Sequence, residues 1–261
     1  MKKCLRTMFS LAIASGLTLA VMSSADARPA TAGATIKGKV TLDGEAPKDA
    51  KLKIDPNHKD AGHCAKGDTQ DLTWVTGEGN GLAEVVVFLK PAPGKKFNVD
   101  LGQKTWTDQV VIDQPFCRFN PHVSAMFAEY GGKPVQKLLI KNSAPILHNS
   151  RVAGGALKNP ARGETLASGK EKEFSVKADT EAIKINCDAH KWMDAYVWAF
   201  DHPYFAVTDA NGNYEIKNVP TDIEVSVMAW HEVGTAKPGE EKKPKGLLKD
   251  GDTINFPIKK K

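Results

Sequence analysis

One short stretch of the chain brings together three side chains that can bind a soft metal ion. Residues 187–193 contain Cys187, His190 and Met193, which offer a thiolate, an imidazole and a thioether, at the end of a predicted strand. A second imidazole, His148, lies about forty residues upstream, just after an apolar stretch that is also predicted to be a strand. Two imidazoles, one thiolate and a weak thioether are the ligand set of a mononuclear copper site for electron transfer. The pattern predicts one copper ion per chain, bound by these four residues.

Each of the four residues also has a plainer explanation when it is taken alone. A histidine after a strand is more often a hydrogen-bonded surface residue than a ligand. Cys187 could be a buried structural thiol, and Met193 could fill a gap in the core. The combination is much more specific, because a structural cysteine does not require a histidine and a methionine at these offsets.

The start of the chain has the pattern of a secretory signal peptide. A short positive region ending at Arg6 precedes an apolar run at residues 8–22, and residues 25–27 form an Ala-x-Ala cleavage site. A membrane anchor is the alternative, but the apolar run is short and interrupted by polar residues. We expect residues 1–27 to be removed, no later segment to span a bilayer, and the mature protein to be periplasmic or otherwise exported.

Charge and motifs argue against several other classes of function. Removal of residues 1–27 would lower the formal charge from +5 to +3, because three basic groups and one acidic group are lost. This mild charge does not suggest nucleic-acid binding. The chain has no phosphate-binding loop, no serine-hydrolase motif and no paired carboxylates for acid–base catalysis. We therefore expect neither a nucleic-acid partner nor an enzyme activity.

The cysteine count supports the copper hypothesis. The mature chain would keep Cys64, Cys117 and Cys187. In an oxidising compartment two of them would normally form a disulfide, and the odd thiol would need another role. Pairing Cys64 with Cys117 leaves Cys187, the cysteine with metal-ligand neighbours.

The rest of the chain has the pattern of short β-strands with almost no helical periodicity. Residues 35–42 alternate apolar with polar, and residues 82–89 form an apolar run typical of a strand buried on both faces. Many short strands between Gly, Pro, Asn and Asp turns predict an all-β protein with room for two sandwiches. Residues 28–33 and 234–246 are predicted to be a linker and a mobile loop. Further strands are predicted at residues 109–112, 135–140, 171–176, 182–186, 196–200, 204–208, 214–216 and 223–230.

The middle of the chain carries the motifs of a known family. An early strand starts near residues 116–122, an Asn-containing turn at residues 142–149 leads to His148, and a later strand ends in the ligand loop at residues 187–193. In these motifs residues 108–202 resemble a cupredoxin of the plastocyanin and azurin type. The resemblance implies a Greek-key β-sandwich with a type 1 (blue) copper centre that carries single electrons between redox protein partners.

The resemblance also implies roles for residues beside the ligands. Asn149 matches the residue that ties the two ligand loops together by hydrogen bonds. His190, with Trp192, matches the histidine whose ring edge reaches an apolar surface, where the electron would pass. The chain departs from plastocyanin in having two residues, not four, between His190 and Met193. This tighter loop occurs in bacterial and archaeal cupredoxins and limits how close Met193 can come to the metal.

The segments on either side resemble a different family. Residues 36–40 and 83–89 are similar to the first half of a carboxypeptidase regulatory-like (prealbumin-like) domain, and residues 206–232 are similar to its second half. This resemblance implies a smaller β-sandwich, made of residues 28–107 and 203–261, into which the cupredoxin is inserted or against which it is packed. Insertion is tolerated where the host's chain ends lie close together.

Several alternatives stay open. The protein could bind copper for delivery or storage, and the flanking sandwich alone would suit an adhesive or scaffolding module. A nitrite reductase or multicopper oxidase would need further histidine-rich motifs, and the chain has no His-x-His pair. The redox partner, the potential and the oligomeric state are not encoded in these motifs. A looser second metal site is conceivable at His58, His63 and Cys64, although His58 follows an apparent exposed turn, whereas structural hydrogen bonds are expected for His122, His202 and His231.

Overall fold

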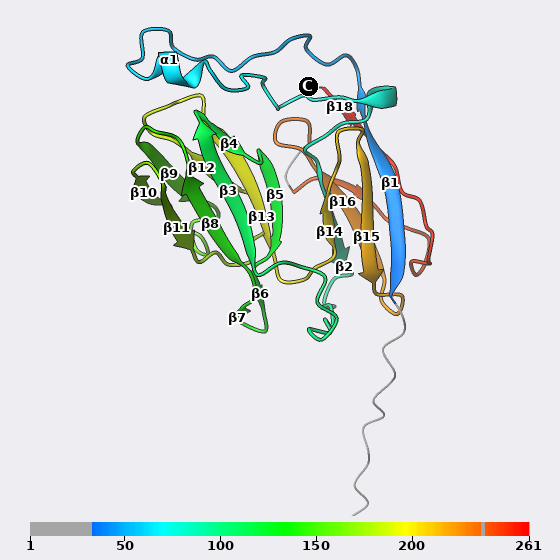
Figure 1. Ribbon diagram of the computed structural model, residues 1–261. Helices are drawn as coiled ribbons and strands as arrows, with labels where there is room; N and C mark the ends of the chain where they lie inside the picture. The colour runs from blue at the N-terminus through cyan, green and yellow to red at the C-terminus, as the bar shows by residue number, and fades with distance from the viewer. Residues whose placement is uncertain (1–32, 236–237, 261) are drawn as a thin grey trace, which may run out of the picture. The chain divides into compact units, whose positions relative to one another are not determined.

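The structure is a computed structural model that describes residues 33–235 and 238–260 (Figure 1). The predicted signal peptide at residues 1–27 lies outside the described residues. The described chain is almost entirely β, so the all-β prediction is confirmed. Its helices are α1 (Ala61–Cys64) and the 3₁₀ helix η1 (Glu78–Asn80). Within the described ranges, no helix is long and apolar enough to cross a membrane.

Residues 109–200 form two sheets that enclose an apolar core, and we call this unit the central sandwich. One sheet has the order β10-β9-β12-β13-β5 and the other β11-β8-β3-β4. Fully buried residues from both sheets, such as Ile112, Ile140, Ile185 and Val197, meet between them. The strands are β3 (Gln109–Phe116), β4 (Arg118–Asn120), β5 (Val123–Phe127), β8 (Lys137–Asn142), β9 (His148–Ala153), β10 (Arg162–Leu166), β11 (Lys170–Phe174), β12 (Ile183–Asn186) and β13 (Asp194–Phe200), with a small hairpin of β6 (Glu129–Tyr130) and β7 (Lys133–Pro134).

Strands from the two flanks of the chain pair with each other, and we call the unit they form the flanking sandwich. One sheet has the order β15-β1-β18 and the other β14-β2-β16-β17. Residues such as Ile36, Val87, Ile216 and Phe256 form its core. Its likeness to prealbumin-like domains, and the division into separate domains, stay predictions. The strands are β1 (Ala34–Asp43), β2 (Val86–Pro91), β14 (Phe205–Val207), β15 (Asn213–Val219), β16 (Val225–Trp230), β17 (Glu240–Lys242) and β18 (Phe256–Lys259).

An aromatic cluster joins the two sandwiches. Phe88 on β2 lies 4.9 Å from the Trp198 ring on β13, and Trp198 lies 5.9 Å from Trp230 on β16, measured between ring centroids. Beside it, His122 Nε2 lies 2.6 Å from Glu232 Oε1. The central sandwich therefore buries part of its apolar surface against the flanking one.

Strands β5, β10 and β18 were not predicted, and the strand pattern differs from the prediction in three further places. β9 was not predicted, and it starts at His148 itself; its inward residues include polar His148 and Ser150, which hide the usual alternation. The run at residues 82–89 is interrupted at Glu84, which has a φ of 59°, so β2 begins only at Val86. The predicted loop at residues 234–246 contains the short strand β17.

A long segment, residues 44–85, leaves the flanking sandwich after β1 and returns to it at β2. We call it the connecting segment, because a disulfide attaches it to the central sandwich. It carries α1, whose last residue, Cys64, forms a disulfide with Cys117 between β3 and β4 of the central sandwich. The predicted pairing of these two cysteines is confirmed, and Cys187 is the free one among the described residues. The disulfide places α1 at the end of the central sandwich, as Figure 1 shows.

Candidate metal centre

Two of the predicted ligands are positioned by neighbouring strands of one sheet. His148 opens β9 and Cys187 follows the last residue of β12, and these strands pair antiparallel with Asn186 opposite Arg151. Extending this register by one residue sets Cys187 opposite Ser150. Because side chains alternate along a strand, Ser150 and His148 lie on the same face. His148 and Cys187 therefore both point into the end of the sandwich, and neither has any exposed surface.

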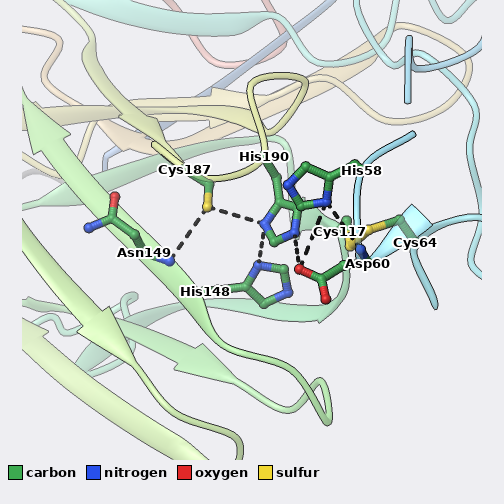
Figure 2. Close-up of a disulfide and its surroundings, with 8 residues drawn as sticks. All are labelled: His58, Asp60, Cys64, Cys117, His148, Asn149, Cys187 and His190. Carbon is green, nitrogen blue, oxygen red and sulfur yellow. Dashed lines mark hydrogen bonds and ion pairs between the residues drawn. A yellow bond between two sulfur atoms is a disulfide. The ribbon is translucent and has the colours of Figure 1, made fainter. Parts of the chain in front are cut away.

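His190 completes a cluster of three donor atoms (Figure 2). Its Nδ1 lies 3.2 Å from His148 Nδ1 and 3.5 Å from Cys187 Sγ. In protein metal sites such as those of zinc, imidazole nitrogen lies about 2.0 Å and thiolate sulfur about 2.3 Å from the ion. At angles of roughly 105–110° such bonds separate two nitrogens by about 3.2 Å and a nitrogen from a sulfur by about 3.5 Å. The three donors are thus spaced as ligands of a single ion.

Both imidazoles are suited to bind a metal at neutral pH. Burial, together with the neighbouring His190 and His63, lowers the pKa of His148 to about 4. Burial also lowers the pKa of His190, although the adjacent Asp60 carboxylate opposes that shift. Neutral imidazole keeps the lone pair that a metal requires.

The ligand loop is closed by its own backbone. The Met193 N–H donates to the His190 carbonyl at 2.9 Å, and the Cys187 N–H donates to the Met193 carbonyl at 3.2 Å. Met193 is buried in the same apolar cluster as Cys187. These contacts return Met193 to the neighbourhood of the three donors. Its thioether as a fourth, weak ligand stays a prediction.

Asn149 makes the connections that the resemblance implies. Its backbone N–H points at Cys187 Sγ, 3.5 Å away, and its side-chain Oδ1 accepts the Asp188 N–H at 3.2 Å. One residue at the start of β9 therefore holds the ligand loop that follows β12. Hydrogen bonds around the cysteine sulfur are one of the features that tune the potential of a copper site.

The exposed ring edge expected for His190 is a wrong prediction. His190 has no exposed surface, and its Nε2 lies 3.2 Å from Asp60 Oδ2. The His58 ring lies 4.7 Å from the His190 ring and 5.4 Å from Trp192, between centroids. The turn at His58 is also less exposed than expected, since its side chain is 21% exposed. The connecting segment covers the site, and no local pattern in residues 55–60 indicated this.

The conceivable second site does not assemble as proposed. Cys64 is in the disulfide, and the His63 ring lies against Phe116, 5.4 Å away. His58 instead joins a group with Asp60 and the candidate ligand His190. The remaining histidines make hydrogen bonds, as expected of structural groups: His122 with the Asp194 carbonyl and Glu232, His202 with the Tyr204 N–H, and His231 with the Thr73 carbonyl and the Gly234 N–H.

Comparisons with known proteins give weak matches. No protein-family model matches the chain, and no curated protein matches it. An oxidised amicyanin variant is 15% identical over 35% of this chain and 82% of its own, with a TM-score of 0.29. A purple cupredoxin from Nitrosopumilus maritimus is 16% identical over 34% of this chain and 97% of its own, with a TM-score of 0.27. A copper-containing nitrite reductase from Thermus scotoductus is 15% identical over 42% of this chain and 25% of its own, with a TM-score of 0.29. At this level of likeness the function has to be inferred from the chain's own side chains.

Proposed function

We propose that this protein is an exported type 1 copper protein that carries single electrons between redox partners. The observation that supports this is the convergence of His148 Nδ1, His190 Nδ1 and Cys187 Sγ, at ligand spacing, in a fully buried site. Copper bound there would alternate between Cu(I) and Cu(II), so that the chain carries one electron and performs no bond chemistry.

The donor set fits copper in both of its oxidation states. A thiolate suits Cu(I), and imidazole suits either state. The backbone pairing of β9 with β12 and the Asn149 bond to Asp188 hold the donors in place. A site that is already arranged changes little when its charge changes, which favours rapid electron transfer. Met193 as the weak axial donor is part of this proposal.

Burial weighs against copper delivery or storage. To hand copper to another protein, a site must exchange its ligands for those of the partner, and this requires that a ligand be accessible. His148, Cys187 and His190 have no exposed surface, and Asp60 covers the outer nitrogen of His190. An electron can pass through packed side chains without any exchange of ligands.

Export is part of the same proposal. The Cys64–Cys117 disulfide is of a kind that persists in oxidising compartments such as the periplasm. The pattern of residues 1–27 points the same way.

Metal analysis and spectroscopy of the purified mature protein test the proposal. We expect one copper per chain, an intense visible band from thiolate-to-Cu(II) charge transfer, and a Cu(II) resonance with narrow hyperfine splitting. Cys187→Ser should abolish the band, because the donor of the charge transfer is removed. Cys64→Ser combined with Cys117→Ser tests whether the other two sulfurs contribute, and the folded variant should keep the band. A protein that holds only colourless Cu(I) would indicate delivery or storage, and one that binds no copper would overturn the proposal.

A further inference from the structure

The side chain of Asp60 bonds to a distant histidine and not to the helix that Asp60 precedes. It is the N-cap residue of α1, where an aspartate ordinarily accepts a backbone N–H from the first turn of its own helix. Its side chain makes no such bond. Its Oδ2 lies instead 3.2 Å from Nε2 of His190, 130 residues further along the chain. A capping bond stabilises the helix that it caps, so the carboxylate forgoes local stabilisation for a contact at the candidate metal centre.

The surrounding chain fixes Asp60 in this position from both sides. The Asp60 carbonyl accepts the Cys64 N–H at 3.0 Å, and the Cys64–Cys117 disulfide anchors this turn of helix to the central sandwich. On the other side, the Asp60 N–H donates to Nδ1 of His58 at 3.2 Å. The Asp60 carboxylate is therefore held over His190 by a covalent link four residues away and by its own backbone.

The contact determines which nitrogen of His190 carries the hydrogen. A carboxylate can only accept a hydrogen bond, so Nε2 must be the protonated nitrogen. Nδ1 is then unprotonated, and its lone pair points toward His148 and Cys187, which lie 3.2 and 3.5 Å away. A carboxylate behind a ligating histidine fixes the ring's orientation and makes the imidazole a more basic ligand.

We propose that Asp60 is a positioning residue of the copper centre. It holds His190 in the tautomer and orientation that copper needs, and its negative charge favours Cu(II) over Cu(I). This inference rests on the proposed function and adds a residue from outside the central sandwich to the site. The resemblance implied an exposed ring edge for His190, whereas here a carboxylate covers that edge.

Two substitutions separate the charge of Asp60 from its role as an acceptor. Asp60→Asn keeps an acceptor oxygen and loses the charge, whereas Asp60→Ala loses both. Removal of such an outer partner typically weakens metal binding about 10- to 100-fold. If that loss falls mainly on Cu(II), the reduction potential rises by about 59 mV for each factor of ten, and more in Asp60→Ala than in Asp60→Asn. Asp55→Asn is the matched control, because Asp55 is an exposed aspartate of the same segment whose Oδ1 accepts the Asn57 N–H.

Nitrogen NMR of the full mature chain, metal-free and loaded with Cu(I), reads the tautomer independently of the potential. In the metal-free protein we expect a protonated Nε2 for His190 in the wild type and in Asp60→Asn, and a mixture of tautomers in Asp60→Ala. In the Cu(I)-loaded protein, copper on Nδ1 should leave Nε2 protonated in every variant. His231 serves as an internal reference, because its Nε2 bonds to the Thr73 carbonyl, 2.7 Å away, and none of the variants touches it.

The outcomes distinguish this inference from the proposed function. A wild-type protein that binds no copper, or binds it without a visible band, overturns the proposed function and the role of Asp60 with it. Normal copper binding and colour, combined with a potential and a His190 tautomer that neither Asp60 variant changes relative to Asp55→Asn, overturn the role of Asp60 alone. A raised potential in both variants, with mixed tautomers in Asp60→Ala, supports it.

Discussion

The two sides of the candidate metal centre are held by different kinds of structure. On the inner side, His148 and Cys187 continue strands β9 and β12, which are paired in one sheet, and Asn149 joins them. On the outer side, His58 and Asp60 belong to a segment whose regular structure is limited to short helices and isolated bridges. The inner side is held by the backbone hydrogen bonds between β9 and β12, whereas the outer side is attached to the central sandwich by the Cys64–Cys117 disulfide.

This difference suggests that the inner side forms the metal site and that the outer side controls access to it and its potential. A segment with few backbone hydrogen bonds opens at a lower free energy than a paired strand. Changes on the outer side should therefore alter access to the centre, its potential and the orientation of His190, while His148 and Cys187 stay in place. Changes on the inner side should disturb the ligands themselves. The predictions that follow test this division, beginning with the largest effect.

Loss of the disulfide should have the largest effect on stability and a small one on colour. The bond closes a loop of 53 residues, so in the chain-entropy model Cys64→Ser combined with Cys117→Ser lowers the free energy of unfolding by about 4 kcal/mol. Denaturant unfolding of the copper-loaded protein measures this loss, and hydrogen exchange should show faster opening of residues 44–85. A lost visible band in the folded variant would contradict the division into two sides. Thiol counting on the unfolded, metal-free wild type should find one free cysteine.

Asn149→Ala tests the inner side. The variant keeps the backbone N–H that points at Cys187 Sγ and loses the acceptor of the Asp188 N–H. A lost hydrogen bond of this kind costs about 1–2 kcal/mol, and the freed ligand loop should broaden the Cu(II) resonance. Asn186→Ala is the control, because its amide donates an exposed hydrogen bond to the Asp188 side chain. Equal spectra for the two variants would show that Asn149 does not hold the ligand loop.

The inner side was largely predictable from the sequence. Cys187, His190 and Met193 lie within seven residues. The odd cysteine count predicted one free thiol, and pairing Cys64 with Cys117 left Cys187. The strand β9 was one exception, because the candidate ligand His148 and a buried serine occupy its inward positions. Period-two alternation finds a strand only where the inward residues are apolar.

The outer side was not predictable from local pattern. His58 and Asp60 follow an Asp-Pro turn and look like exposed loop residues, while their partner His190 is 130 residues away from Asp60. The Cys64–Cys117 pairing was the available signal, since it draws residues near Cys64 toward the start of β4. The contact between the sandwiches was missed for a similar reason: Trp198 was predicted to lie on a strand, but the pattern did not show that Phe88 and Trp230 would cover it.

Met193→Leu tests whether the inner side has a fourth ligand. Leucine conserves volume and should change stability by less than about 1.5 kcal/mol. If the thioether is a weak axial donor, its loss destabilises Cu(II), so the protein should keep its colour and its potential should rise. Met126→Leu is the control, because Met126 is a buried methionine of the same core on β5. Identical potentials in the two variants would show that Met193 packs in the core and is not a ligand.

His58→Ala should have the smallest effect on stability and a specific effect on access. The His58 side chain is 21% exposed and covers the His190 ring at 4.7 Å, so its removal shortens the distance at which a reagent can approach that ring. A change at a partly exposed position should cost less than about 1 kcal/mol. The rate of electron exchange with a small inorganic oxidant should rise severalfold, with the visible band unchanged. The rates are compared after correction for the measured potentials, because the variant also removes the acceptor of the Asp60 N–H. Asn57→Ala, at the exposed neighbouring position, should leave that rate as it is. If the exchange rate is the same in both variants, electrons enter elsewhere and the connecting segment does not control access to His190.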